Sequence, residues 1–257
     1  MMKGKSAEMK NIDNLKEFFY KGANRICVPI VGVEEKDILD SARQILNYPA
    51  EVVEWRIDTY AQYKDIDKVI NLANEIKNIL NMPVLGTFRT HKEGGESYIE
   101  PSDYCKMLSK LIIDTDIDMI DVEYFFLEEG ELRTLIGLAH ENNVLVIGSN
   151  HDFDKTPDTE EIYDRLKNMY VVGMDISKIA VMPNSKMDVI RLLEATCRIN
   201  EEYSDIRTIT MSMSDIGSIS RVIGGEFGNV MTFGTAKLAS APGQIDSNRL
   251  RNILDII

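Results

Sequence analysis

The sequence predicts an α/β protein, a single-domain (β/α)₈ barrel, on three observations. Eight short runs rich in apolar and β-branched residues start about 24 to 35 residues apart, which leaves room for one helix between successive runs. Most of these runs are nearly continuously apolar, as in parallel strands buried on both faces. Strict alternation of strand and helix over about 230 residues is typical of this barrel.

The predicted strands follow one another along the chain, and amphipathic stretches separate them. They cover residues 26–31, 51–57, 84–88, 119–123, 144–147, 176–181, 206–211 and 230–233. An open, doubly wound sheet is the alternative arrangement, but the GxGxxG signature that often follows its first strand is missing here. We therefore expect residues 26–257 to form the barrel as the catalytic domain.

The stretches between the strands read as helices. Residues 65–80 carry apolar side chains at 3.6-residue spacing, and residues 102–115 do so after a Pro-Ser start signal. The acidic segment 156–161 opens another helix, and residues 248–257 form a short final one. Residues 1–25 form an N-terminal extension, for which a helix and a hairpin at the barrel bottom both remain open.

Composition and charge narrow the range of partners. The chain has 257 residues with 44% hydrophobic and 28% charged residues, as in ordinary globular proteins. Acidic residues outnumber basic ones by 42 to 29, and a net charge of −13 matches a nucleic-acid backbone poorly. We therefore expect no nucleic-acid partner, and an anionic substrate would need arginines gathered locally.

Cysteine usage and hydropathy indicate the compartment. The cysteines Cys27, Cys105 and Cys197 are scattered, with no CxxC or Cys/His cluster, so the sequence supports neither a disulfide framework nor a zinc site. No apolar leader opens the chain, and no segment approaches the length of a membrane span. The expectation is a cytoplasmic protein without membrane contact.

Polar residues recur at two-residue spacing near the ends of several predicted strands. Residues two apart in a strand face the same side, and the carboxyl ends of barrel strands form the active site. A buried lone charge costs several kcal/mol unless it is paired, so charges in many strands together indicate a shared site rather than chance. The pairs are Glu54 with Arg56, Thr87 with Arg89, Asp121 with Glu123, and Ser149 with His151.

Lys178 is the sharpest signal, because it lies in the middle of the apolar run 176–181. Burial and neighbouring cations lower the pKa of a lysine and leave a free amine that attacks carbonyls to form a Schiff base. Arg56, Arg89 and Arg221 would supply those cations. His151 lies in the loop expected after the fifth strand and is a candidate general acid and base.

Seven ordered motifs resemble the type I 3-dehydroquinate dehydratase family of the shikimate pathway. The resemblance runs from about residue 26 to the C-terminus. The motifs are EWRID at 54–58, FRTHKEGGE at 88–96, SNHDF at 149–153, SKIAVMP at 177–183, TMSM at 210–213, SRVIGGEFG at 220–228 and TFGTAKLASAPGQ at 232–244.

The resemblance implies a (β/α)₈ barrel that needs no metal or organic cofactor and forms a homodimer. It implies that Lys178 forms the Schiff base, that His151 is the general acid and base, and that Glu93 orients His151. The substrate-binding groups it implies are Glu54, Arg56, Arg89, Arg221, Ser240 and Gln244, with Arg221 as a bidentate carboxylate clamp and the last two in a closing lid.

Two departures from the family pattern stand out. Some members carry a substrate-contacting serine on the first strand where this chain has Pro29, which removes a hydroxyl contact without touching the chemistry. The stretch before Arg25 does not match the usual short N-terminal hairpin.

The function implied is dehydration of 3-dehydroquinate to 3-dehydroshikimate through an imine and an enamine. Two alternatives stay open at this stage. One is another Schiff-base lyase on the same barrel, such as an aldolase, although no phosphate cradle precedes the last helix. The other is a barrel that binds a cyclic polyol acid without turning it over.

Overall fold

The computed structural model describes residues 11–236 and 243–257, and within them the strands form one curled parallel sheet. The sheet runs in the order β7-β6-β5-β4-β3-β2-β1-β8, and the short β9 pairs with the end of β8. The strands are β1 Arg25–Ile30, β2 Val52–Arg56, β3 Val84–Thr87, β4 Met119–Glu123, β5 Leu145–Asp152, β6 Ile176–Val181, β7 Thr208–Ser212, β8 Met231–Thr235 and β9 Ile245–Asp246.

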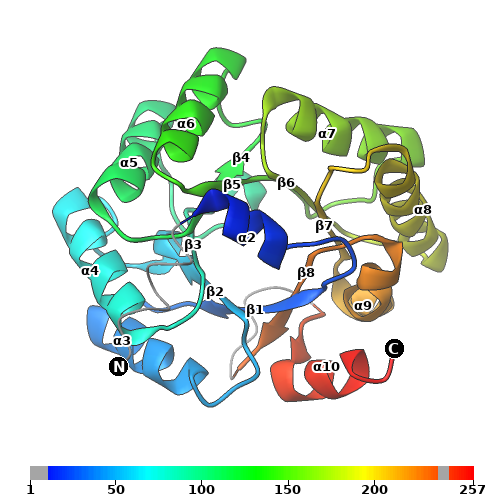
Figure 1. Cartoon of the computed structure of the whole chain (residues 1–257), viewed down its shortest axis with the longest axis horizontal. Coiled ribbons are helices and arrows are strands. Elements are labelled where there is room, and N and C mark those ends of the chain that lie inside the picture. The colour runs from blue at the N-terminus through cyan, green and yellow to red at the C-terminus, as the bar shows by residue number, and fades with distance from the viewer. Residues whose placement is uncertain (1–10, 237–242) are drawn as a thin grey trace.

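Helices surround this sheet, as the view down the barrel shows (Figure 1). They follow the strands in alternation, so each crossover returns the chain to a parallel neighbour. The helices are α2 Ile12–Phe18, α3 Glu35–Ile45, α4 Ile66–Ile79, α5 Pro101–Asp114, α6 Glu129–Glu141, α7 Thr159–Val172, α8 Lys186–Glu202, α9 Ser214–Ile223 and α10 Ser247–Leu254, with 3₁₀ turns η1 Ile57–Thr59, η2 His91–Glu93 and η3 Gly224–Phe227.

A side-chain amide helps to close the barrel between β7 and β8. A single main-chain bridge joins Thr208 to Asn229. The Oδ1 atom of Asn229 accepts from the main-chain N–H of Thr210 at 3.0 Å, and its Nδ2 donates to the carbonyl of Thr210 at 2.9 Å. The amide thus replaces the ladder partner that Thr210 would otherwise lack.

The strand residues alternate between two separate apolar cores. Val53 and Trp55 point outward into the large core between the sheet and the helices, as the sequence predicts. Residues at the amino ends of the strands, such as Cys27, Val52 and Leu85, point inward and pack together inside the barrel. The fold class predicted from the sequence, a single-domain α/β barrel, is confirmed.

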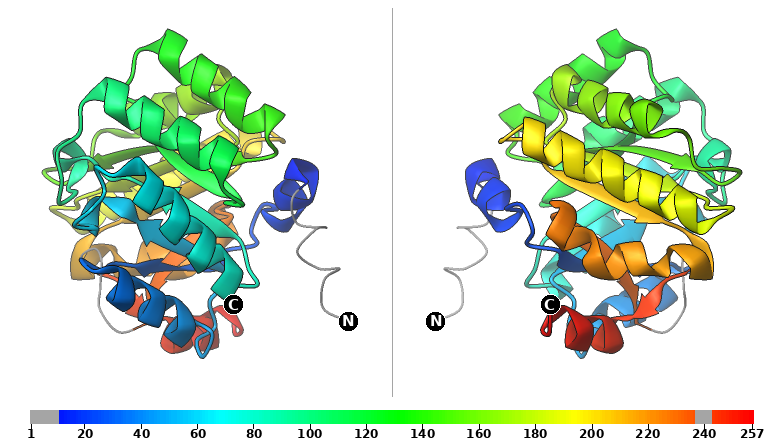
Figure 2. Two further views of the ribbon diagram at one scale, coloured as in Figure 1. Left: turned by 90° about the vertical axis from the view of Figure 1, so that its left-hand side faces the viewer. Right: turned by 90° about the vertical axis from the view of Figure 1, so that its right-hand side faces the viewer.

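The helix α2 covers the amino ends of the strands, opposite the mouth of the barrel (Figure 2). Leu15 and Phe19 are fully buried and belong to the inner core. Arg207 donates to the carbonyl of Phe19 at 2.9 Å, and Lys16 forms an ion pair with Asp175 at 2.7 Å. Of the two forms left open for the N-terminal extension, residues 12–18 adopt the helix.

Most element bounds predicted from the sequence are correct to within two or three residues. The predicted helices 65–80 and 102–115 are α4 and α5, the final helix is α10, and α7 starts at Thr159 after the Asp158 cap. One strand is longer than predicted, because β5 runs on through Asp152. His151 therefore lies on a strand, and its predicted place in a following loop was wrong.

Candidate active site

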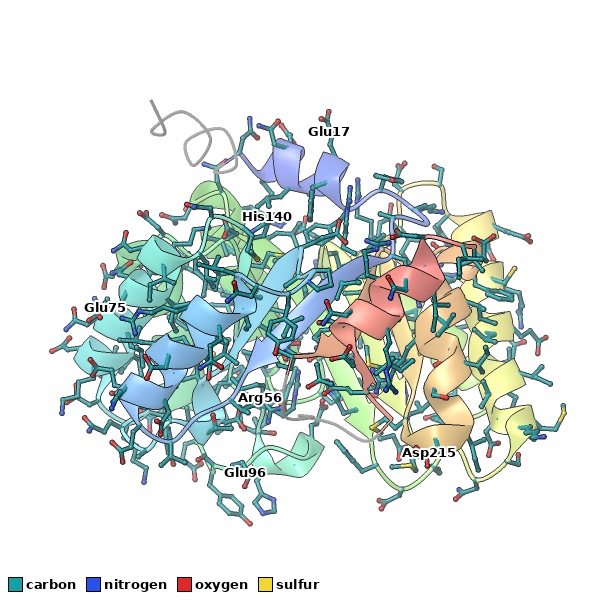
Figure 3. All side chains as sticks on the ribbon, turned by 90° about the horizontal axis from the view of Figure 1, so that it is seen from below. Glu17, Arg56, Glu75, Glu96, His140 and Asp215 are labelled. Carbon is teal, nitrogen blue, oxygen red and sulfur yellow. The ribbon has the colours of Figure 1, made fainter. Side chains whose placement is uncertain are left out.

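A cavity opens at the carboxyl ends of the strands. Figure 3 shows this end of the barrel, where Arg56, Glu96 and Asp215 lie, opposite the end that carries Glu17 of α2. Polar and charged residues from β2 to β6 line the cavity together with apolar ones from β7 and β8. The lining residues are Glu54, Arg56, Arg89, Glu93, Gly94, His151, Phe153, Lys178, Ala180, Met211, Met213, Arg221, Phe233 and Gln244.

Lys178 projects from the middle of β6 into the cavity and is 3% exposed. Its Nζ atom lies 3.0 Å from a carboxylate oxygen of Asp121 and 3.6 Å from one of Glu54. The ring of Phe233 lies beneath it, with its centroid 4.7 Å away. The three arginines expected around this amine, Arg56, Arg89 and Arg221, line the same cavity, but the ion pairs of Lys178 itself are with the carboxylates of Asp121 and Glu54.

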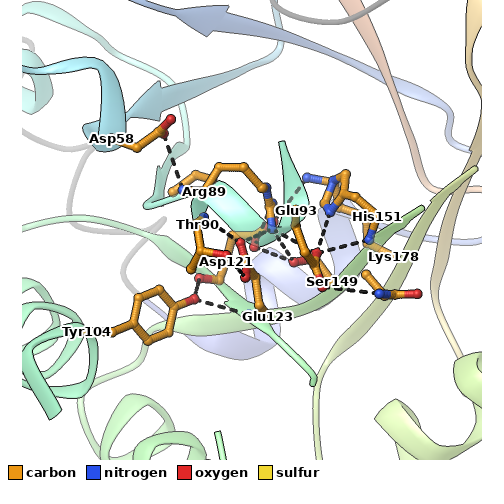
Figure 4. Close-up of polar contacts among 12 residues, drawn as sticks. Asp58, Arg89, Thr90, Glu93, Tyr104, Asp121, Glu123, Ser149, His151 and Lys178 are labelled. Atoms are coloured by element: carbon orange, nitrogen blue, oxygen red, sulfur yellow. Dashed lines mark hydrogen bonds and ion pairs between the residues drawn. The ribbon is translucent and has the colours of Figure 1, made fainter. Parts of the chain in front are cut away.

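Asp121 ties this amine to the rest of the site (Figure 4). Its other oxygen, Oδ1, accepts from the guanidinium of Arg89 at 2.9 Å and from the hydroxyl of Ser149 at 2.5 Å. Burial alone would raise the pKa of Asp121, but the charges of Arg89 and Lys178 outweigh it and hold the pKa below its usual value. Asp121 is therefore an ionised acceptor for the amine.

Arg89 is enclosed by three carboxylates, two from β4 and one from η2. It lies 2.9 Å from Asp121, 2.9 Å from Glu123 and 3.5 Å from Glu93. Burial would lower the pKa of Arg89, but these carboxylates raise it above its usual value. Glu123 also accepts from the main-chain N–H of Thr90 at 2.7 Å, which fixes the loop that leads to Glu93.

His151 and Glu93 form a buried pair beside the amine. The Nδ1 atom of His151 lies 2.9 Å from Oε2 of Glu93, and that oxygen also accepts from the main-chain N–H of His151 at 2.9 Å. Burial, together with the charges of Arg89, Lys178 and Arg56, lowers the pKa of His151 well below its usual value. Burial raises the pKa of Glu93 to about 8 against the opposing charge of Arg89.

Arg56 is held in place by a residue that the sequence analysis did not assign. Its Nε and Nη2 atoms each donate to the carboxylate of Asp58 at 2.8 Å, in a bidentate pair. Asp58 also accepts from the main-chain N–H groups of Arg89 at 3.2 Å and Glu96 at 3.1 Å. This one buried carboxylate therefore positions Arg56 and both ends of the segment that carries Glu93.

The side of the cavity nearest β7 and β8 is less polar. Arg221 of α9 is 1% exposed, donates from Nη1 to the sulfur of Met211 at 3.4 Å, and has a pKa that burial lowers to about 10. Gln244 reaches the cavity from the segment before β9. Ser240, the other residue assigned to a lid, lies outside the described residues.

Eight of the nine residues singled out by the sequence and the resemblance therefore meet at one cavity. The polar partners Asp121, Glu123 and Ser149 were recognised as facing inward but received no role. Asp58 and Asn150 were missed. Asp58 stands four residues after Glu54 in the motif 54–58, and its acidic charge two residues from Arg56 was the available signal.

This geometry provides three chemical functions in one enclosed space. A buried amine can add to a ketone, and an imidazole paired with a carboxylate can move a proton at neighbouring carbon. Arg56, Arg89 and Arg221 bring positive charge to the cavity wall, and the planar guanidinium of Arg221 suits a carboxylate. The arrangement therefore fits a small, polar, anionic carbonyl compound.

Known proteins with similar sequences point to one family. The family model described as type I 3-dehydroquinase matches residues 26–257. The 3-dehydroquinate dehydratase of Listeria monocytogenes serotype 4b is 48% identical over 240 residues, which are 93% of this chain and 94% of that protein. The enzyme of the same description from Clostridium kluyveri is 42% identical over 238 residues, 92% of this chain and 93% of that protein.

Solved structures agree with the sequence comparisons. The type I 3-dehydroquinate dehydratase of Clostridium difficile, solved with covalently modified comenic acid, superposes with a TM-score of 0.87 and 41% identity, covering 91% of this chain and 92% of that one. The 3-dehydroquinate dehydratase of Enterococcus faecalis gives a TM-score of 0.86 and 38% identity, covering 92% and 95%. The chain therefore belongs to the type I 3-dehydroquinase family of hydro-lyases.

Proposed function

We propose that this enzyme dehydrates 3-dehydroquinate to 3-dehydroshikimate through an imine on Lys178. The amine adds to the ring ketone and water leaves, which gives an iminium that acidifies the adjacent C–H. Loss of that proton gives an enamine, the enamine expels the tertiary hydroxyl as water, and a final water hydrolyses the imine. One water is consumed and two are released, so the net change is the loss of one water.

The surroundings of Lys178 fix the position of its amine in the cavity. Asp121 and Glu54 lie 3.0 and 3.6 Å from its Nζ atom, on the wall of the cavity. They hold the amine in one place, and Asp121 is itself fixed by Arg89 and Ser149. An amine that is already positioned reacts with little reorganisation.

His151 serves as general base and then as general acid in this proposal. Its Nδ1 side is taken by Glu93, so the Nε2 atom is the one left for substrate. When Glu93 is ionised, it accepts the Nδ1–H and leaves a lone pair on Nε2, the form that removes the proton. The protonated pair then donates to the departing hydroxyl, so one imidazole serves one face of the ring.

The remaining lining residues bind the substrate in this proposal. Arg221 is the carboxylate clamp, because it is buried and its planar fork suits a carboxylate. Arg56 and Glu54 bracket the ring hydroxyls from β2, and Arg89 supports the carboxylates around the reacting centre. Ser240 and Gln244 are the proposed lid contacts.

The observation that carries the proposal is the buried Lys178 amine beside the Glu93–His151 pair in one cavity, in a chain of this family. The Clostridium difficile neighbour, whose title describes a covalently modified comenic acid, supports covalent chemistry in this fold.

A direct ultraviolet assay tests the activity, because the product is a conjugated enoate and the substrate is not. Purified enzyme with 3-dehydroquinate should develop the absorbance of 3-dehydroshikimate. Aldol cleavage without that absorbance would favour the alternative lyase, and binding without turnover would favour a non-catalytic barrel. Either result would contradict the proposed reaction.

The proposal also includes the assembly and its location. Among the described residues, none of the helices combines the length and apolar character that a membrane crossing requires. We place the enzyme in the cytoplasm, which suits its three free cysteines, and expect a homodimer from the resemblance to its family. Sedimentation equilibrium at micromolar concentration checks the dimer.

A further inference from the structure

A chain of hydrogen bonds leads from the outer helix α7 to the Glu93–His151 pair. Arg165, on α7, donates from Nη1 to Oδ1 of Asn150 at 2.6 Å. Asn150, on β5 just before His151, donates from Nδ2 to Oε1 of Glu93 at 3.1 Å. The other oxygen of Glu93 takes the two contacts from His151. The four residues connect the rim of the barrel to the imidazole.

The arginine determines which way the amide of Asn150 faces. A guanidinium can only donate hydrogen bonds, so the amide atom that meets Arg165 has to be the carbonyl oxygen. The NH₂ group is then directed at Glu93. Glu93 thus faces a donor on its Oε1 side and the main-chain N–H of His151 on its Oε2 side. Donors on both oxygens favour the ionised carboxylate.

We propose that Arg165 and Asn150 form a positioning pair that holds Glu93 as an ionised acceptor for the Nδ1–H of His151. The pair touches no reacting atom and acts through Glu93 on the tautomer of the imidazole. With the Nδ1–H given to Glu93, the Nε2 atom carries the lone pair that the reaction needs. This inference rests on the proposed function, since it refines the role of the same base.

Other charges act on this pair, and they oppose one another. Arg89 favours ionised Glu93 from 3.5 Å, whereas Glu123 and Asp121 of β4 disfavour it. His151 is in turn kept uncharged by burial and by three cations, Arg89, Lys178 and Arg56. Arg165 is also paired with Glu161 on its own helix. The charges that favour and those that disfavour ionised Glu93 thus largely offset one another. In this proposal the NH₂ group of Asn150 then decides whether Glu93 or the imidazole holds the shared proton.

Nitrogen-15 NMR of the histidine rings reads this proton directly. The chain has three histidines, and variants of His91 and His140 assign the remaining ring to His151. In the free wild-type enzyme the ring should carry its proton on Nδ1 at high pH and change form as the Glu93–His151 pair takes up a proton. In Asn150→Leu that change should move up by about one pH unit, since a hydrogen bond to a charged group is lost.

Kinetics give the second readout. The acid limb of kcat/KM should move to higher pH in Asn150→Leu, with a roughly tenfold loss near neutral pH and a nearly unchanged plateau at high pH. Arg165→Met keeps Asn150 in place and should move the same limb less, and the double variant should be non-additive. Arg133→Met is the matched control, because Arg133 makes the same i,i+4 pair, with Glu129 of α6, away from the cavity.

The outcomes separate this inference from the proposed function. If Asn150→Leu does not fold, Arg165→Met carries the test alone. Unchanged ring shifts and an unchanged acid limb in a folded variant would overturn the positioning pair, even if the wild type dehydrates 3-dehydroquinate. A wild type without activity would overturn the proposed function, while the ring tautomer would still report on Asn150 and Arg165.

Discussion

The two ends of the same strands make opposite use of the barrel interior. Near the amino ends, inward residues such as Val52 of β2 and Ile176 of β6 join the apolar inner core beneath α2. Two residues further along, the inward positions are Glu54 and Lys178, and they face the cavity. A shift of two residues along a strand thus separates the apolar half of the barrel interior, at the amino ends, from the reactive half, at the carboxyl ends.

The two ends of the barrel contribute differently to stability and to chemistry. At the amino end, burial of apolar area stabilises the fold and needs no exact orientation. At the carboxyl end, carboxylates, guanidiniums and an amine are buried only because they pair with one another, as Arg89 does with Asp121 and Glu123. Substitutions at the two ends should therefore affect different measurements.

Removing the amine should have the largest effect. Lys178→Ala should lower kcat by on the order of 10⁴- to 10⁶-fold, as expected when a covalent nucleophile is lost. The melting temperature should change little, because Asp121 keeps Arg89 and Ser149 as partners. Steady-state kinetics and thermal unfolding check this, with Lys186→Ala on the exposed face of α8 as control. Substantial residual turnover would place the chemistry elsewhere.

Truncation of a side chain in the inner core, at the amino ends of the strands, should lower stability and leave kcat nearly unchanged. Phe19→Ala opens the inner core beneath α2 and should lower the free energy of unfolding by about 3–5 kcal/mol. The kcat of the protein that remains folded should stay near the wild-type value. Denaturant unfolding measures the loss, and Phe125→Ala is the control because that ring is 59% exposed. A selective loss of kcat would mean that the two ends are coupled.

Asp58→Asn separates substrate binding from the chemical step within the reactive half. It keeps the volume but weakens the bidentate pair with Arg56, so substrate binding should suffer more than the chemical step. We expect KM to rise roughly tenfold or more, with a smaller change in kcat, since charged hydrogen bonds are the stronger ones. Asp40→Asn, which breaks an exposed pair with Arg43, should leave both constants unchanged. A change in kcat alone would contradict this role.

The pH dependence tests the reactive half without any substitution. Burial raises the pKa of Glu93 to about 8, so the Glu93–His151 pair gains a proton as the pH falls through that value. The gained proton removes the free Nε2 lone pair, so kcat/KM should fall below about pH 8, by about tenfold per pH unit well below it. A profile measured at constant ionic strength checks this. A flat profile from pH 6 to 9 would contradict it.

The sequence predicted the fold and most of the cavity for identifiable reasons. Alternation within a strand is a local rule, so Glu54 with Arg56 and Asp121 with Glu123 could be placed on inward faces before the structure was known. Lys178 stood out because a charge interrupts an apolar run. These signals depend only on neighbours in the chain.

The partners across the barrel could not be predicted in the same way. The contacts of Lys178 with Asp121 and Glu54 depend on strand register and side-chain reach, which the order of residues along the chain does not give. The amide of Asn150 presents its NH₂ group to Glu93 because Arg165, on another element, donates to its oxygen. The extension of β5 through His151 was not predicted, because strands were recognised as apolar runs and the last residues of β5 are polar.

Borohydride reduction tests the central claim most directly. Wild-type enzyme mixed with 3-dehydroquinate and borohydride should gain the mass of a reduced adduct, and peptide mapping should place it on Lys178. Lys178→Ala should give no adduct, whereas His151→Ala should lose turnover and still form some. An active wild type that yields no adduct, or carries it on another lysine, would contradict the account.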